Sequence, residues 1–246
     1  AAYTAVDRAE NEEEQAFAIN ANGAGHLAFA AETHGIPLLH VSTDYVFDGT
    51  AREPYREDAP CNPINVYGAS KLAGENYLRT LSDNYLLIRS SWLYGINGKN
   101  FVQAILDKAK AKEFIRDTMN RAKAVAEAPS TLSVVDDQVG SPTYTKDLAL
   151  AVAFLIRKNA TGIVHVTNRG SCSWHQFAVR ILKSAGYGHI VVEPIKSSEL
   201  QRPAMRPAYS ILSNKTFIEI TGKAMQPWQL ALEDYLNNFK LKKSHS

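Results

Sequence analysis

The stretch Ile36-Pro37-Leu38-Leu39-His40-Val41-Ser42-Thr43 decides the fold class of this sequence. Its apolar residues form a run short enough for a buried strand, and the run ends in the hydroxyl side chains of Ser42 and Thr43. Helical and strand-like patterns alternate before and after it, and this alternation predicts strands that pair in parallel. The sequence therefore indicates an α/β protein built on a parallel sheet.

A second stretch, Tyr67-Gly68-Ala69-Ser70-Lys71, begins a helical pattern and places Tyr67 and Lys71 on one helix face. A free tyrosine has a pKa of about 10, and a nearby ammonium group lowers that pKa because it favours the phenolate. Thr43, at the end of the preceding strand, can hydrogen-bond a substrate carbonyl while Tyr67 transfers a proton and Lys71 tunes the tyrosine. The pattern predicts a proton-transfer site, although Tyr and Lys at this spacing are also common on solvated helix faces.

The composition excludes several classes of protein. Basic and acidic side chains nearly balance, 27 against 25, and this gives no indication of a nucleic-acid partner. The two cysteines, Cys61 and Cys172, are far apart and lack metal-ligand spacing, which predicts a reduced protein with no metal site that can be assigned. No apolar stretch is long enough to span a bilayer, so we expect no membrane partner and a cytoplasmic protein.

Longer motifs surround the two stretches. They are STDYVFDG at residues 42–49, YGASKLAGE at 67–75, RSSWLYG at 89–95, DDQVGSPTYT at 136–145 and RPAYS at 206–210. Together they resemble the extended short-chain dehydrogenase/reductases, and among these the dTDP-4-dehydrorhamnose reductases. The resemblance extends over nearly the whole chain.

The resemblance implies a Rossmann-like, doubly wound parallel sheet with a smaller C-terminal α/β substrate lobe. We expect residues 1–140 to form the remaining part of the NAD(P)-binding domain and residues 141–246 mainly the substrate lobe, with interleaved boundaries. The glycine-rich turn that holds a dinucleotide pyrophosphate is missing, because Gly23 and Gly25 lie inside a helical pattern rather than after a strand. We therefore expect a further N-terminal part, on the order of 60 residues, before Ala1.

The resemblance also implies an activity, the reduction of the 4-keto group of a dTDP-4-dehydro-6-deoxyhexose by NADPH or NADH. The catalytic residues it implies are Thr43, Tyr67 and Lys71. Those implied to bind the cofactor are Ala2, Tyr3, Thr4, Tyr67 and Lys71. Those implied to bind the dTDP-sugar are Thr43, Asp44, Tyr45, Trp92 and Arg206. A homodimer is also implied, with Mg²⁺ at the dimer interface in some members but with no ligands assignable here.

Two other functions remain open at this point. Nucleotide-sugar epimerases and dehydratases share the Thr, Tyr and Lys, although Trp92 and residues 134–145 favour the reductases. Some relatives are non-catalytic regulatory subunits, such as that of methionine adenosyltransferase, although the intact Thr43, Tyr67 and Lys71 favour catalysis.

Several single residues have two interpretations. Asn20 is either an ordinary polar helix residue or one that orders the site, and Trp92 is either a core aromatic residue or a contact of the sugar ring. His165 and His175 lack a carboxylate or cysteine cluster, so we expect packed or surface imidazoles rather than metal ligands. Residues 112–131 are rich in helix-forming residues, which predicts an extended helix or helical hairpin, exposed or used in oligomer contact.

Overall fold

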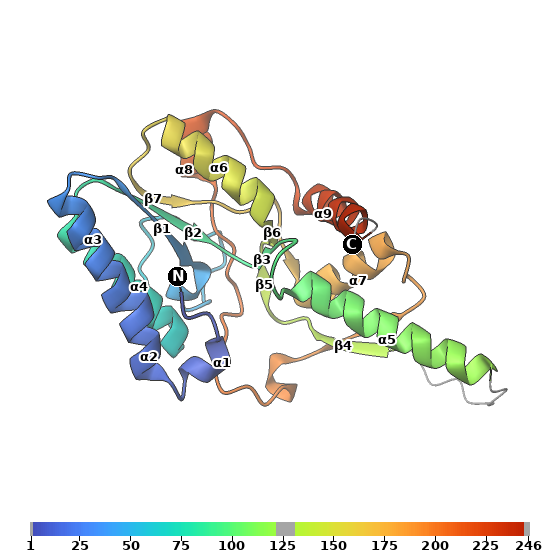
Figure 1. The fold of residues 1–246 in the computed structure, drawn as a ribbon. Coiled ribbons are helices and arrows are strands. Elements are labelled where there is room, and N and C mark those ends of the chain that lie inside the picture. Colours follow the sequence, from blue (N-terminus) through green and yellow to red (C-terminus); the bar gives the residue numbers. More distant parts are fainter. Residues whose placement is uncertain (1, 122–130, 244–246) are drawn as a thin grey trace.

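The computed structural model describes residues 2–121 and 131–243, and its first layer is a three-stranded sheet (Figure 1). Strands β1 (Leu38–Thr43), β2 (Tyr85–Ser90) and β7 (Gly162–His165) pair in parallel in the order β1-β2-β7. The central strand β2 is buried along nearly its whole length, as is typical of a parallel sheet covered on both faces. The parallel pairing confirms the predicted α/β class.

Helices cover both faces of this sheet (Figure 1). Leu87 of β2 packs with residues of α3 (Gly23–Thr33) and α4 (Val66–Leu81) on one face. Its neighbours Leu86 and Ile88 pack with residues of α6 (Thr145–Arg157) and α8 (Lys215–Thr221) on the other. The alternation follows from the two-residue period of a strand. Helices on both faces are what the doubly wound arrangement predicts.

Short elements precede and connect these layers. They are α1 (Val6–Ala9), α2 (Glu13–Phe17), the π-helical segment Ala18–Asn22, the 3₁₀ helices Asp44–Val46 and Ser197–Glu199, and two short strand pairs. In the pairs, β3 (Leu93–Tyr94) runs parallel to β6 (Thr143–Tyr144), and β5 (Val139–Gly140) runs antiparallel to β8 (Cys172–Ser173).

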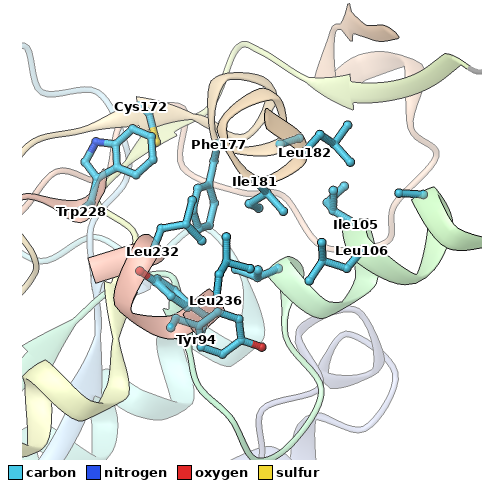
Figure 2. Packing of buried hydrophobic residues seen from close by; sticks show 14 of the residues in the cluster. Tyr94, Ile105, Leu106, Cys172, Phe177, Ile181, Leu182, Trp228, Leu232 and Leu236 are labelled. Carbon is cyan, nitrogen blue, oxygen red and sulfur yellow. The ribbon is translucent and has the colours of Figure 1, made fainter. Parts of the chain in front are cut away.

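A second hydrophobic core lies beside the sheet layers (Figure 2). It is enclosed by α5 (Phe101–Arg121), α7 (Trp174–Ala185), α9 (Trp228–Lys243) and the parallel pair β4 (Thr131–Val135) and β9 (Val191–Ile195). The helix α5 confirms the predicted helical extension as far as Arg121. The rest of that prediction, residues 122–130, lies outside the described residues.

The chain passes between the two cores more than once. Both α5 and β4 precede residue 140 but belong to the second core, whereas α6, β7 and α8 follow it but belong to the sheet layers. The two cores are therefore interleaved along the sequence, and the functional division at residue 140 stays a prediction. No helix within the described ranges has the length and apolar character needed to cross a membrane.

A buried ion pair fastens α4 to the sheet. Arg89 of β2 donates to both carboxylate oxygens of Glu75 of α4, with its shortest hydrogen bond at 2.6 Å, and the two side chains are 1% and 0% exposed. Arg89 also lies 5.2 Å from the centre of the Phe47 ring and 3.5 Å from Nε2 of His165. The predicted packing of His165 is confirmed, because its ring is buried and contacts the Tyr55 carbonyl.

Glu75→Gln is expected to destabilise the fold by about 3–5 kcal/mol, because it leaves the Arg89 charge buried without its counter-ion. Glu219→Gln is the matched control, since its partner Lys215 is 3.7 Å away and both side chains are more than half exposed. This change is expected to cost less than about 1 kcal/mol. Urea unfolding of both variants tests the comparison, and equal losses of stability would contradict it.

Candidate active site

The first turn of α4, which carries Tyr67, is fixed by two side-chain caps. Asn65 accepts a hydrogen bond from the Gly68 amide at 2.7 Å, and Glu10 accepts one from the Val66 amide at 2.9 Å. These bonds satisfy amides that a helix start leaves unpaired, and the Glu10 carboxylate also suits the positive end of the helix dipole. Tyr67 therefore has a well-defined backbone position.

Thr43, Tyr45 and Tyr67 come together because Gly68 has no side chain. A Cβ atom at Gly68 would lie 2.2 Å from the Tyr45 carbonyl oxygen, so only glycine allows α4 to approach the end of β1 this closely. The Thr43 hydroxyl then lies close enough to the Tyr67 phenol to lower its pKa, and the Tyr45 ring meets the Tyr67 ring edge-on at 5.7 Å. The structure thus brings together the predicted hydroxyl and phenol.

Lys71 lies one helical turn beyond Tyr67, but its ammonium group is directed at β1. Its Nζ donates to the Val41 carbonyl at 2.7 Å and lies 3.3 Å from Nε2 of His40. Burial lowers the pKa of Lys71 to about 8 and, with the Lys71 charge nearby, lowers that of His40 to about 4. At neutral pH Lys71 is therefore a cation beside a neutral imidazole.

The pKa of Tyr67 differs from the predicted direction. Burial raises it to about 12, the Thr43 hydroxyl lowers it, and the Asp44 carboxylate raises it. The predicted lowering by Lys71 is absent from these effects, because the ammonium group is held against the backbone of β1. Tyr67 is therefore a protonated phenol at neutral pH.

Asp44 is a buried carboxylate at the end of β1. It is 2% exposed, and burial raises its pKa to about 6 although hydrogen bonds with Ser210 and Thr43 favour the ionised form. Within the described residues its Oδ2 has no hydrogen-bond partner, and neither do the Oγ atoms of Ser42 and Ser90. An unpaired buried polar atom is unfavourable, and ligands of open α/β sheets bind at this carboxyl edge. The residues present thus fit a polar ligand at the ends of β1 and β2.

Asn20 fixes the N-terminal residues against α4. Its Nδ2 donates to the Tyr3 carbonyl and to the Ser70 hydroxyl, both at 3.0 Å, and its Oδ1 accepts from the Tyr3 amide at 2.8 Å. Asn20 is buried within the π-helical segment, and such segments often occur at functional sites. Of the two interpretations of Asn20, the structure therefore favours the one in which Asn20 orders the site. The neighbours Ala2 and Thr4 are exposed.

Arg206, which the sequence resemblance implies to bind the dTDP-sugar, forms an ion pair within the chain. Its guanidinium donates to both carboxylate oxygens of Asp7, at 2.9 and 2.7 Å, and to the Ala204 carbonyl at 2.8 Å, and it lies near the Tyr45 phenol. It ties α1 to the C-terminal segment, and a role in substrate binding stays a prediction. The exposed Arg202 lines a hollow with Arg206, and no hydrogen bond to its guanidinium is found across the described parts of the chain.

Trp92 lies at the same edge of the sheet as Thr43. It follows Ser90 by two residues, and Ser90 is in register with Thr43. Its indole is partly buried and stacks on Trp174 from α7. The structure thus brings Thr43, Asp44, Tyr45, Tyr67 and Arg206 into one cluster, with Lys71 one helical turn further along α4 and its ammonium against β1. It places Trp92 beyond the end of β2, against the second core.

Four residues that contribute to the site were not identified by the sequence analysis. They are Asp7, Asn65, Trp174 and Ser210. Asn65 had a local signal, since asparagine before an amphipathic run favours a helix N-cap. The others act on partners far away in the sequence, and no local pattern indicates them. In the part of the chain that the structure describes, no three His, Cys, Asp or Glu side chains are grouped as metal ligands.

Comparisons with known proteins agree on one family. The family model described as the RmlD substrate binding domain matches residues 1–121 and 113–241. The spore coat polysaccharide biosynthesis protein SpsK of Bacillus subtilis is 41% identical over 96% of this chain and 76% of its own length. The dTDP-4-dehydrorhamnose reductase of Streptomyces griseus is 40% identical over 95% of this chain and 73% of its own length. The crystal structure of dTDP-4-dehydrorhamnose reductase from Bacillus anthracis with NADP has a TM-score of 0.86 and 39% sequence identity. The match covers 96% of this chain and 78% of the chain in that crystal structure.

Asp44→Asn is expected to stabilise the protein above pH 6 by about 2–3 kcal/mol. The pKa of Asp44 is raised from 3.8 to about 6, so its ionisation opposes folding. The penalty is absent below pH 3.8, grows between pH 3.8 and 6, and is complete above that. Urea unfolding as a function of pH measures the difference between the variant and the wild type.

Asp48→Asn is the matched control of opposite sign. Hydrogen bonds, chiefly from Thr50, lower the pKa of Asp48 to about 2, so its charge stabilises the fold above pH 3.8 and this contribution is lost as the pH falls towards 2. Asp48→Asn should therefore be less stable than the wild type at pH 7. An Asp44→Asn variant that is also less stable at pH 8 would contradict this account.

Proposed function

The chain belongs to the RmlD substrate binding domain family, and on this premise we propose that it reduces dTDP-4-dehydro-6-deoxy-L-mannose to dTDP-L-rhamnose. The observation that carries the proposal is the proximity of the Thr43 hydroxyl and the Tyr67 phenol at the carboxyl edge of the sheet. A hydroxyl and a phenol at this position can together hold and protonate a carbonyl oxygen.

The proposed cofactor is NADPH or NADH, held by Ala2, Tyr3, Thr4, Tyr67 and Lys71. When bound, it supplies the hydride that adds to the carbonyl carbon. Lys71 has three N–H donors, and two are directed at the Val41 carbonyl and His40. The third remains for a ribose hydroxyl. The unpaired Ser90 hydroxyl and Asp44 carboxylate oxygen supply further polar groups at the same edge.

Tyr67 suits the direction of reduction. Burial and the Asp44 charge keep it protonated before the reaction, so it has a proton to give to the oxygen that becomes an alkoxide. Thr43 holds that oxygen next to the phenol. Of the groups around Tyr67, Thr43 is the one that favours the phenolate left after the transfer, because its hydroxyl lowers the Tyr67 pKa. The environment thus stores the proton on Tyr67, and Lys71 serves the cofactor rather than the phenol.

The diphosphate of the dTDP-sugar is proposed to bind Arg202. Arg202 lines the hollow beside Ala204 and Arg206, and it is free to turn towards an anion, whereas Arg206 is held by Asp7. Arginine suits a diphosphate because its forked donors match two oxygens. Arg206 then acts by holding Tyr45 beside Tyr67. A homodimer stays a prediction.

Tyr67→Phe is expected to lower kcat about 10²- to 10⁴-fold, because it removes the proton donor. Its Kd for NADPH should change far less than kcat, since the ring, the helix and the other proposed cofactor contacts are kept. Tyr77→Phe is the matched control, because Tyr77 lies on the same helix but is 45% exposed. Its kcat should equal that of the wild type.

The assay follows NADPH oxidation with the dTDP-4-keto sugar, and fluorescence titration measures NADPH binding. Full activity in Tyr67→Phe would refute the proton-donor role. Wild-type protein that binds NADPH but oxidises none with this substrate would instead favour a non-catalytic, regulatory function.

A further inference from the structure

Trp92 has a strained backbone. Its φ is +48°, and the other non-glycine residue at positive φ in the described ranges is Asn159. Asparagine tolerates this left-handed region, but a bulky side chain there costs about 1–2 kcal/mol. Such strain persists where the surroundings enforce it, and it is concentrated at ligand-binding sites. The strain at Trp92 therefore requires neighbouring contacts that hold its backbone and indole in this conformation.

One of these contacts is Trp174. The two indoles are nearly parallel, at an interplanar angle of 5°, with centroids 3.5 Å apart. Trp174 is the first residue of α7, directly after the Ser173 capping box, and the Phe101 ring packs against it with the ring centroids 4.5 Å apart. The capped helix and Phe101 thus make Trp174 a fixed surface that covers one face of the Trp92 indole.

The second contact is the backbone at Gly140. A Cβ atom there would lie 2.5 Å from Cε2 and 2.6 Å from Nε1 of Trp92, so the indole rests directly on this glycine. Gly140 is paired with Cys172 across β5 and β8, and Trp174 follows directly after β8 as the first residue of α7. Trp92 is therefore confined in a slot made by Gly140 and Trp174.

The slot lies just beyond the end of β2, the strand that pairs with β1. The Trp92 carbonyl accepts a hydrogen bond from the Thr143 amide at 3.2 Å, and the preceding Ser91 hydroxyl donates to the Ser141 carbonyl at 2.9 Å. These bonds tie the chain after β2 to residues 141–143, and Ser90 remains in register with Thr43. The orientation of the Trp92 indole at the site rim is thus set by the second core.

We propose that Trp174 is a positioning residue of the reductase, and that it fixes Trp92 in the one orientation in which the open edge of its indole borders the sugar. The proposal rests on the proposed function and deepens it. Without Trp174, the left-handed backbone at Trp92 has no stacking partner to hold it and relaxes. The sugar carbonyl then loses its alignment with Thr43 and Tyr67, and alignment errors of about 1 Å lower rates about 100-fold.

Two variants of Trp174 and one control test this role. Trp174→Ala removes the stack, whereas Trp174→Phe keeps an aromatic face. Trp228→Phe is the control, because Trp228 is the third tryptophan of the chain, lies in the same core and packs on Phe177 rather than on Trp92. Stacked indoles couple their electronic transitions, so the pair gives a circular-dichroism couplet that reports the stack independently of activity.

Trp174→Ala is expected to lose the couplet and to reduce kcat/KM for the dTDP-4-keto sugar about 10- to 100-fold. Its Kd for NADPH should stay within about twofold of wild type. Trp174→Phe should recover most of kcat/KM, and Trp228→Phe should keep the couplet and the wild-type kcat/KM. Addition of the dTDP-sugar should change the wild-type couplet, because the sugar contacts one member of the pair.

Two results would overturn the inference. One is wild-type kcat/KM in Trp174→Ala after the couplet is lost, and the other is an equal loss of kcat/KM in Trp174→Ala and Trp228→Phe, which would indicate a general packing role. Failure of the proposed function is recognised separately, because the wild-type protein would then show the couplet without oxidising NADPH in the presence of the sugar.

Discussion

The buried ion pair between Glu75 and Arg89 is the constraint on which the rest of the site depends. Tyr67, Lys71 and Glu75 follow one another at intervals of four on α4, so they form a single stripe on one helix face. Because Glu75 is fastened to the middle strand of the sheet, the whole stripe is held in register with the strand ends. The Glu75 charge also opposes the lowering of the Lys71 pKa by burial. One ion pair thus sets both the position of the phenol and the charge of the lysine.

The electrostatics of the site are governed by burial more than by the neighbouring cation. Burial keeps the proton on Tyr67 and makes the ionised form of Asp44 unfavourable. The buried Asp44 carboxylate lowers the stability of the fold at neutral pH, but it has an unpaired oxygen for a ligand. The protonated Tyr67 phenol begins the reaction as an acid. Active sites commonly combine function with a local loss of stability.

Local patterns were sufficient for much of the fold and for the centre of the site. The alternation of elements predicted the parallel sheet, and the four-residue spacing correctly placed Tyr67 and Lys71 on one face. The direction of the Lys71 ammonium was not predictable, because it depends on a carbonyl 30 residues away. The partner of Arg206 is separated from it by 199 residues. Contacts of this kind depend on how the elements pack, and no helical or strand period encodes them.

The most direct test of the account is a single turnover with NADPH that carries deuterium at its transferable position. The purified protein, the labelled cofactor and dTDP-4-dehydro-6-deoxy-L-mannose are combined, and the product is analysed by NMR and mass spectrometry. The account predicts one NADPH oxidised per sugar and one deuterium at C4 of dTDP-L-rhamnose. An unlabelled product, or an unchanged sugar with intact NADPH, would contradict it.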